Sequence, residues 1–238
     1  MRILPAVAGC VTAAGLALAG CSAGAVPASQ LPHTVLLAYD GRPAAELVVT
    51  SGADSITIGT GTRGGPLVRA HTPPHSGVRP VLRTGRDRHV VWVGLDHTGL
   101  RGPADLRISL SPSVRWRIVL AAGAPILRLD LADARLSWLD IKAGFSTITA
   151  RLPDPSGQVT ATVSGGASSI GVTIPAAVPA RLTLAGGAGS ATLAGRSYTG
   201  IAGGTVLTTP GWPSSTNRYQ FDLIAGVSSI SVRARTAT

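Results

Sequence analysis

A short phrase built on glycine recurs along this chain and constrains its fold more than any other feature. Each copy opens with a glycine, continues with small residues and reaches an aliphatic residue four positions later. The copies occupy residues 52–56, 123–127, 144–148, 166–170, 187–191 and 226–230, and those at 144, 166 and 226 are the closest to one another. From Gly123 to Gly187 the phrase returns at a nearly constant interval, and the step from Gly187 to Gly226 is almost twice as long. A fixed period of this kind is typical of stacked structural units.

Apolar residues alternate with small or polar ones inside each unit. One such series, Val159, Ala161 and Val163, precedes the adjacent Gly165 and Gly166. A period of two predicts short strands with one buried face. Paired glycines predict a tight turn between the strands, because glycine tolerates positive φ. Two short strands cannot bury their apolar side alone, so we expect successive units to share one narrow core.

Prolines and the long step mark the limits of the units. Pro153, Pro155, Pro175 and Pro179 fall where strands should end, which suits a residue without an amide proton. The step from Gly187 to Gly226 is nearly two periods. We therefore expect that one unit is rewritten between residues 200 and 217.

The composition excludes several other fold classes. Of 238 residues, 45% are hydrophobic, 13% charged and 4% aromatic, so small aliphatic side chains fill the core and the bulk of the chain is not disordered. With one Lys (Lys142) and one Glu (Glu46), strong helix formers other than Ala and Leu are scarce, which excludes a helix bundle. Cys10 and Cys21 both lie near the N-terminus and cannot form a disulfide scaffold. We predict an all-β fold of stacked short-strand β-repeats, solenoid-like or of toast-rack form, with a less regular N-terminal β region, and the sequence leaves open whether the stack is an open solenoid or a closed sandwich.

The N-terminal half is less regular than the repeat. Residues 46–49 and 55–58 have the pattern of a strand pair, and residues 89–95 have that of another strand. Residues 60–80 between them are rich in Gly, Pro, Arg and His, which predicts a long loop or an irregular edge. Composition does not change sharply beyond position 105, so we favour one continuous β body.

The first 20 residues have the pattern of a secretory leader. Arg2 is followed by an uncharged run from 3 to 19 and by small residues. Leu18, Ala19, Gly20 and Cys21 resemble the lipobox of bacterial lipoproteins. That resemblance implies cleavage before Cys21 and a diacylglyceryl group on its thiol, which would hold the protein on the extracytoplasmic face of the cell membrane.

An ordinary secretory signal with an unmodified Cys21 is the alternative to lipidation. No later segment approaches 18 continuous apolar residues, so we expect no membrane span. The small, uncharged residues after Cys21 predict a flexible tether. The expected parts are a signal peptide (1–20), a tether (21–33), an N-terminal β region (34–105) and a β-repeat domain (106–235).

Two patterns point weakly to a bound cofactor or metal. Residues 59–64 match the GxGxxG pattern of dinucleotide-binding loops, but Pro73 and Pro74 follow where that pattern needs a helix, so we interpret the segment as a turn. His71 and His75, with His89 and His97, could bind zinc or copper, but their spacing is loose. Solvated loop histidines are the favoured interpretation, and we predict no cofactor.

Catalytic signatures are scarce. The chain has no GxSxG elbow and no SxxK motif. The pair Ser168 and Ser169 occurs again in the repeat as Ser228 and Ser229, which is typical of structural and not of catalytic serines. A carboxylate pair for glycoside hydrolysis stays open, but no feature selects one. We predict that the protein is not an enzyme. An envelope enzyme that uses the loop region 60–97 remains an alternative.

Basic residues give the remaining functional signal. The formal net charge is +10, and arginines gather between residues 79 and 117. Such a field attracts anionic lipid headgroups or acidic cell-wall polymers. The candidate residues for an anionic surface are Arg79, Arg83, Arg86, Arg88, Arg115 and Arg117. A purely compositional origin, in which a GC-rich genome encodes Arg in place of Lys, is the alternative. Nucleic acid is an unsuitable partner for an exported protein with few aromatic residues.

Two tryptophans have contrasting surroundings. Trp116 alternates with Arg115 and Arg117, which predicts that its ring lies in the core, on the side opposite the guanidinium groups. Trp212 lies between Gly211 and Pro213 in the irregular part of the repeat, and it is the best candidate for an exposed aromatic residue.

Residues 129–234 resemble the toast-rack and putative-adhesin β-repeat domains of bacterial envelope proteins. The resemblance lies in phrases such as Gly165, Gly166, Ala167, Ser168, Ser169 and Ile170. Such domains occur in extracytoplasmic parts of cell-wall-stress regulators and in uncharacterised actinobacterial proteins. The resemblance implies a stacked β body without cofactors and brings no catalytic residues. This chain has a lipobox where the stress regulators have transmembrane helices.

These features favour a non-catalytic envelope lipoprotein that presents a β-repeat surface for binding or adhesion to an envelope protein, a polymer or a lipid. An interaction module in envelope-stress sensing is the alternative.

Overall fold

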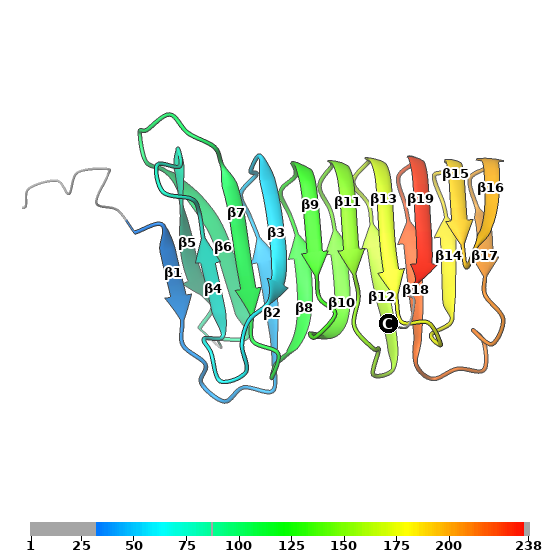
Figure 1. The fold of residues 1–238 in the computed structure, drawn as a ribbon, viewed down its shortest axis with the longest axis horizontal. Coiled ribbons are helices and arrows are strands. Elements are labelled where there is room, and N and C mark those ends of the chain that lie inside the picture. The colour runs from blue at the N-terminus through cyan, green and yellow to red at the C-terminus, as the bar shows by residue number, and fades with distance from the viewer. Residues whose placement is uncertain (1–31, 87, 236–238) are drawn as a thin grey trace, which may run out of the picture.

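The computed structural model describes residues 32–86 and 88–235, which form 19 strands and no helix. The strands make two sheets that face each other along one axis (Figure 1). The leader, Cys21 and most of the proposed tether lie outside the described residues. The described part contains no apolar helix of a length that could cross a membrane.

The ten-stranded sheet has the spatial order β1 (Thr34–Leu37), β4 (Val68–His71), β7 (Asp105–Leu110), β3 (Ser55–Thr60), β9 (Ala124–Asp130), β11 (Phe145–Arg151), β13 (Ala167–Ile174), β19 (Val227–Ala234), β15 (Ala188–Leu193) and β16 (Arg196–Ile201). The nine-stranded sheet has the order β17 (Thr205–Thr208), β14 (Ala180–Leu184), β18 (Arg218–Leu223), β12 (Gln158–Val163), β10 (Arg135–Ile141), β8 (Arg115–Leu120), β2 (Ala44–Val49), β6 (Val90–His97) and β5 (Val78–Thr84).

The repeating unit is a rung of two strands, one in each sheet, joined by a turn. Along the axis the rungs are β6–β7, β2–β3, β8–β9, β10–β11, β12–β13, β18–β19 and β14–β15, and neighbouring rungs pair in parallel in both sheets. At both ends the stack is closed by antiparallel strands, with β1, β4 and β5 at one end and β16 and β17 at the other. The prediction of an all-β fold of stacked short-strand repeats is confirmed.

The rungs do not stack in the order of the sequence. The last rung, β18–β19, returns and lies between β12–β13 and β14–β15. The long step from Gly187 to Gly226 contains an altered unit, as expected: β16 and β17 are one strand in each sheet, but they pair antiparallel with β15 and β14. A return loop follows, and because β16 and β17 occupy the outer edge of β14–β15, the chain re-enters the stack one rung earlier.

The turns at one corner of the stack are short and end in glycine. They cover residues 121–123, 142–144, 164–166, 185–187 and 224–226, and we call them the glycine corner. Neighbouring turns touch there: a Cβ on Gly165 would lie 2.1 Å from the carbonyl oxygen of Ala143, and one on Gly123 would lie 2.3 Å from that of Gly144. The turn prediction is confirmed, but its reason is corrected. Close approach selects Gly165, whose φ is not positive, whereas Gly187 has a φ of +76°.

The inward-facing residues of both sheets form one hydrophobic cluster that runs from Ala45 to Val232. Two large side chains in this cluster form hydrogen bonds to backbone carbonyl groups through their polar atoms. Trp116 is fully buried, as its alternation with arginine predicted, and donates from Nε1 to the carbonyl of Ser111 at 2.9 Å. Tyr219 donates from its hydroxyl to the carbonyl of Pro153 at 2.7 Å, and burial raises its pKa well above the usual value.

Two expectations for the N-terminal half need correction. Residues 46–49 and 55–58 do lie in strands, β2 and β3, but these strands belong to opposite sheets and are not paired with each other. Of the two alternatives for residues 60–80, the long loop is wrong and the irregular edge is confirmed, because they contain β4 and the start of β5 at one end of the stack. Strand β4 has four residues, which is too few for an alternating pattern to be recognised in the sequence. Its hydrogen-bonded pairing with β7 makes it a strand. The division into domains at position 105 remains a prediction.

Candidate functional site

The six candidate arginines all lie on or beside strands of the nine-stranded sheet. Strand β5 carries Arg79 and Arg83, the turn after it carries Arg86 and Arg88, and β8 carries Arg115 and Arg117. On β8 the arginines alternate with buried Trp116 and Ile118, so they point outward. We call the outward side of this sheet the arginine face. In the sheet order, β5 and β8 are three strand spacings apart, about 14 Å.

Half of these arginines have partners within the protein. Arg79 pairs with Asp96 at 3.1 Å, and Arg117 lies 3.7 Å from the carboxylate of Glu46. Arg115 donates to the carbonyl of Ser156 at 3.1 Å. Within residues 32–86 and 88–235, no carboxylate pairs with Arg83, Arg86 or Arg88. These three arginines are exposed and lie at one end of the face.

A groove of about 530 Å³ crosses this end of the arginine face. Its lining residues come from β5, β6 and the turn after β2: Thr50, Ser51, Val81, Arg83, Thr84, Trp92, Gly94, Leu95 and Asp96. Ser51 accepts the backbone amide of Leu95 at 3.0 Å, and Thr50 donates to the carbonyl of Val93 at 3.2 Å. The groove lies in the size range of small-molecule binding sites and combines an aromatic ring, hydroxyls and a guanidinium group.

Arginines lie over tryptophan rings at two further places on the same face. The guanidinium carbon of Arg117 is 5.2 Å from the ring centroid of Trp138. Those of Arg181 and Arg218 are 5.1 and 4.4 Å from that of Trp212. Cation–π attraction fixes each guanidinium group against its ring. Trp212 is half-buried and donates to the carbonyl of Tyr219 at 2.9 Å, so its prediction as an exposed aromatic residue is wrong: the two arginines cover it.

His71 lies beside His33, whose carbonyl oxygen is 3.1 Å from the Nδ1 of His71, but the candidate histidines are divided between the two sheets. His71 lies on β4 of the ten-stranded sheet, whereas His97 lies on β6 of the nine-stranded sheet. The Nδ1 of His71 is 2.9 Å from the hydroxyl of Thr34, and His75 occupies a turn with a φ of +62°. The described residues contain no group of three or more metal-ligating side chains. The proposed metal pair, His71 and His75, therefore gains no further ligands from the fold.

The sites considered for an enzyme have structural surroundings. Residues 59–64 leave β3 through a turn at Gly64 and enter β4, so the helix that a dinucleotide loop needs does not follow. Of the region 60–97, His97 lines a shallow hollow of about 740 Å³ with Asp54, and His71 and His89 do not line it. Ser169 and Ser229 are register partners on neighbouring rungs, 3.4 Å apart at their hydroxyls.

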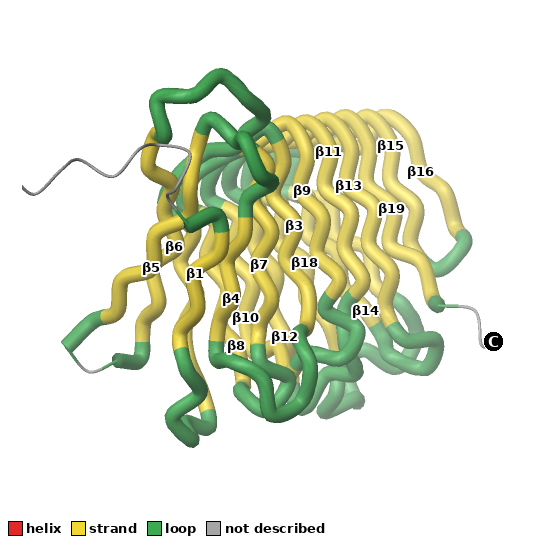
Figure 2. The backbone as a smooth tube through the Cα atoms, turned by 60° about the vertical axis from the view of Figure 1, so that its left-hand side comes forward, coloured by secondary structure: helices red, strands yellow, loops and turns green. Residues whose placement is uncertain are grey.

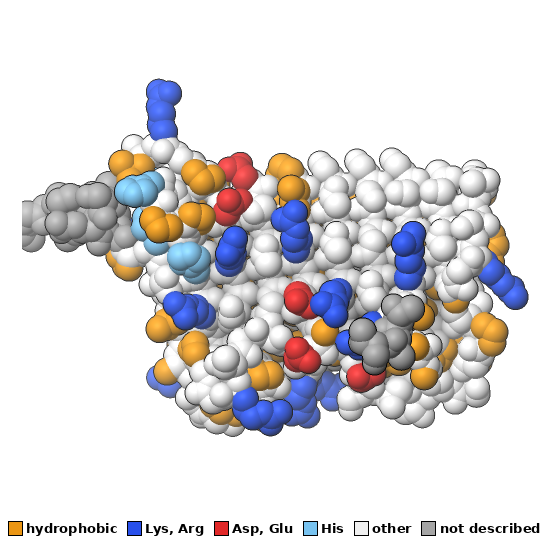
Figure 3. Space-filling view, viewed as in Figure 1, with side chains coloured by type: hydrophobic (Ala, Val, Ile, Leu, Met, Phe, Trp, Pro, Cys, Tyr) orange, Lys and Arg blue, Asp and Glu red, His pale blue; other side chains and the backbone are white. Residues whose placement is uncertain are grey.

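The outward side of the ten-stranded sheet has a different chemistry. Figure 3 views this side, and its right-hand half is mostly white, meaning neither hydrophobic nor charged. Hydroxyl-bearing residues occupy the outward positions there: Thr147, Thr149, Ser169, Thr173, Ser190, Thr192, Ser229 and Ser231. All of them except Thr147 line a trough of about 460 Å³ over β11, β13, β15 and β19, together with Arg233. We call this side the hydroxyl face.

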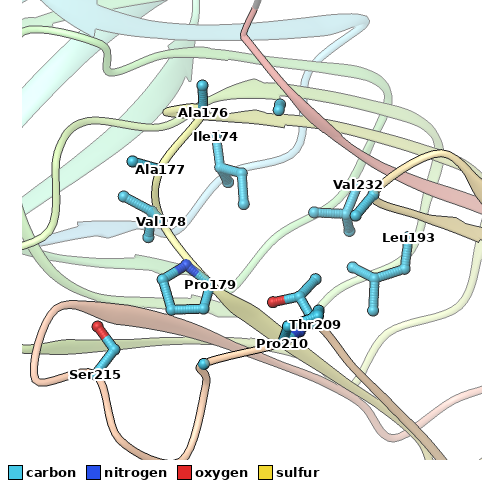
Figure 4. Close-up of a pocket in the computed structure, with 13 residues that line it drawn as sticks. Ile174, Ala176, Ala177, Val178, Pro179, Leu193, Thr209, Pro210, Ser215 and Val232 are labelled. Atoms are coloured by element: carbon cyan, nitrogen blue, oxygen red, sulfur yellow. The ribbon is translucent and has the colours of Figure 1, made fainter.

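An apolar hollow of about 340 Å³ opens near the ends of β13 and β14 (Figure 4). Aliphatic side chains of Ile174, Val178, Leu193 and Val232 surround it, and Ser215 lies at its rim. It contains no charged side chain, so it offers nothing to the anionic partners that the arginines suit.

One solved structure has the same architecture. It is a protein from Clostridium sporogenes described as a "putative cell adhesion protein", and it superposes with a TM-score of 0.65 at 14% identity, over 85% of this chain and 98% of that one. At this identity the likeness shows the fold alone: an all-β body of the kind found in an adhesin-like protein. No protein-family model matches the chain, and no curated protein matches its sequence.

Proposed function

We propose that this protein is a non-catalytic, lipid-anchored binding protein of the cell envelope, which adheres through its arginine face to an acidic polymer. The observation that carries the proposal is the set of exposed arginines, Arg83, Arg86 and Arg88, that no carboxylate of the described chain neutralises. The adhesion role described for the structural neighbour agrees with it. Anchoring rests on the residues from Leu18 to Cys21, outside the described part.

Guanidinium groups suit this role for two reasons. Each presents a planar set of donors that binds a carboxylate or phosphate with two hydrogen bonds. A net charge of +10 also steers acidic partners toward the protein over a distance set by the ionic strength. Binding is therefore expected to weaken as salt rises.

Anchoring is tested by fractionating cells that express the full chain. Globomycin, or the substitution Cys21→Ala, is expected to block processing and release the protein from its normal membrane fraction. An unchanged fraction and an unchanged N-terminal mass would reject the lipid anchor.

Binding is tested with the full chain, purified in detergent, and isolated cell-envelope material in a salt series. The triple variant Arg83→Ala, Arg86→Ala, Arg88→Ala is expected to lose about tenfold or more in affinity. A matched control removes three exposed arginines of the other sheet, Arg107, Arg128 and Arg196. Equal loss in both variants would show that only net charge matters, and it would contradict the proposed face.

A further inference from the structure

Tryptophan distinguishes the arginine face from the hydroxyl face, whereas charge does not. The hydroxyl face also carries exposed arginines, among them Arg107, Arg128 and Arg151. Three of the four tryptophans lie on the arginine face, Trp92 on β6, Trp138 on β10 and Trp212 in the loop before β18, and the fourth is in the core. A surface that served only to attract negative charge would have no need of this bias.

Each outward tryptophan has an arginine beside it. Trp92 is the register partner of Arg83 on the neighbouring strand. Trp138 lies under Arg117, and Trp212 lies between Arg181 and Arg218. These three ring-and-guanidinium stations follow one another across the strands, about three strand spacings or 14 Å apart. They form an oblique row across the strands, because Trp92 is level with Asp140, two residues beyond Trp138, and Arg218 is level with Gln158, two residues before the partner of Trp138.

The same face holds unused hydrogen-bond donors. Three buried side-chain nitrogens of the described residues lack a partner: Arg79 Nε, Trp138 Nε1 and Arg181 Nε. All three belong to outward residues of the nine-stranded sheet. Because these nitrogens are buried, a ligand on the surface does not reach them, and the hydrogen-bond donors it meets are those of the exposed arginines.

We infer that the arginine face binds an acidic glycan, with one sugar ring that carries a carboxylate or phosphate seated in the groove between Arg83 and Trp92. The inference rests on the proposed function and names its ligand. In the groove, the ring of Trp92 offers an apolar surface for the C–H face of a sugar, and Thr50 and Ser51 offer hydroxyls. The guanidinium group of Arg83, which has no carboxylate partner, receives the oxyanion.

A linear glycan fits this line of stations better than a bilayer does. A polymer can run from the groove over Arg117 toward Arg181 and Arg218, meeting at each step a guanidinium group that packs on a tryptophan ring. A lipid surface would interact with exposed arginines on either side of the stack, and both sides have them. The order of the stations therefore favours a chain of sugars with repeated acidic groups.

The experiment measures binding of the full chain, in detergent, to soluble polymers of known chemistry. Polygalacturonate supplies sugar rings with carboxylates, and phosphomannan supplies rings with phosphates. Dextran supplies rings without charge, polyglutamate supplies charge without rings, and phosphatidylglycerol vesicles supply an anionic bilayer. We expect one of the two acidic glycans to bind at least about tenfold more tightly than dextran, polyglutamate or the vesicles.

The variants Trp92→Ala and Arg83→Ala are each expected to weaken glycan binding about tenfold. Arg83 is exposed, so its removal leaves the core intact and keeps the test valid if Trp92→Ala folds poorly. Arg128→Ala, on the hydroxyl face, is the control and is expected to change binding less than twofold. Thermal unfolding of each variant checks that the fold is kept.

Equal binding of polyglutamate and polygalacturonate would overturn the glycan inference while leaving an acid-binding envelope protein in place. Preference for the vesicles, or unchanged glycan binding in both groove variants, would also overturn it. If the full chain did not bind envelope material but bound polygalacturonate through Trp92 and Arg83, the glycan site would be supported. The proposed role in the envelope would be contradicted.

Discussion

The two corners of the stack differ in length, composition and contacts. At the glycine corner, five turns of three residues each end in glycine, and Figure 2 shows them as evenly spaced arcs. At the opposite corner, the connections 131–134, 152–157 and 175–179 vary in length and project as loops (Figure 2). Four prolines, at 153, 155, 175 and 179, lie in those loops, at strand ends as expected.

The period of the glycine phrase arises at the glycine corner. At the glycine corner, neighbouring turns touch through their backbones, so a side chain added at Gly165 or Gly186 would meet the next turn. At the opposite corner the connections differ in length and combine buried residues, such as Leu131 and Leu152, with exposed ones, such as Ala176 and Ala177, and the exposed stretches can change at little cost. The regular spacing of the glycine phrase is therefore set by contact between turns at one corner.

The largest expected effect comes from adding one methyl group at that contact. Gly165→Ala would place its Cβ 2.1 Å from the carbonyl oxygen of Ala143, so backbone must shift, and we expect a loss of about 3 kcal/mol in unfolding free energy. Gly166→Ala is the matched control, because nothing lies within 4 Å of its Cβ and its φ is not positive. It should change stability by less than about 0.5 kcal/mol.

Urea denaturation of both variants makes the measurement. Equal stabilities would show that the glycine corner is not held by close backbone contact.

The next effect concerns a hydrogen bond at the opposite corner. Tyr219→Phe removes the donor to the carbonyl of Pro153 and is expected to cost about 1–3 kcal/mol, because that carbonyl is left without its partner. Burial raises the pKa of Tyr219 in the folded state. The stability that the protonated Tyr219 hydroxyl adds to the folded state is therefore complete below the unfolded pKa of about 10. It is lost as pH rises above that value.

The variant should accordingly show a flatter loss of stability above pH 10 than the original chain in denaturation curves at several pH values. A Phe variant with the same stability and the same alkaline slope would disprove this role for Tyr219.

A smaller effect is expected from lengthening the opposite corner. Two glycines inserted between Ala176 and Ala177, both exposed, should cost about 1 kcal/mol or less, because loop closure depends weakly on length. The same insertion between Ala122 and Gly123 should cost several times more, since the turn would meet that of Gly144. Thermal melts compare the two chains. A similar loss of stability for both insertions would show that the two corners do not differ in their tolerance of longer turns.

The smallest effect lies outside both corners, in the loop after β1. The side-chain hydrogen bond from Arg42 lowers the pKa of Asp40 to about 2. The stability that the Arg42–Asp40 contact adds is present above the unfolded pKa of Asp40, near 3.8. It is lost as pH falls from about 4 to about 2. Asp40→Asn should slightly flatten the acid side of the stability profile, and an unchanged profile would refute the assignment.

The stack could be predicted from the sequence because its contacts are local. The glycines at 123, 144 and 166 recur at a short and nearly constant interval, and alternation from Val159 to Val163 identifies inward positions. Burial of Trp116 follows from the same alternation. These features depend on a residue and its near neighbours, so the sequence displays them directly.

The order of the rungs and the composition of the arginine face depend on distant pairings. The long step from Gly187 to Gly226 does not reveal that β18–β19 returns between two earlier rungs. The contact of Arg117 with Trp138 requires the register between β8 and β10, and that of Arg181 with Trp212 requires the path of the last loop. The bias of tryptophan toward one sheet is the signal that could have indicated this face.

Disulfide trapping tests the rung order directly. In a chain with Cys10→Ala and Cys21→Ala, the pair Ser169→Cys and Ser229→Cys should oxidise readily, because the two residues are register partners on adjacent strands. Ser169→Cys with Ser190→Cys should stay reduced, since β19 lies between β13 and β15 and separates them by about 10 Å. A bond in the second pair and none in the first would mean that the units follow one another in chain order, contrary to the structure.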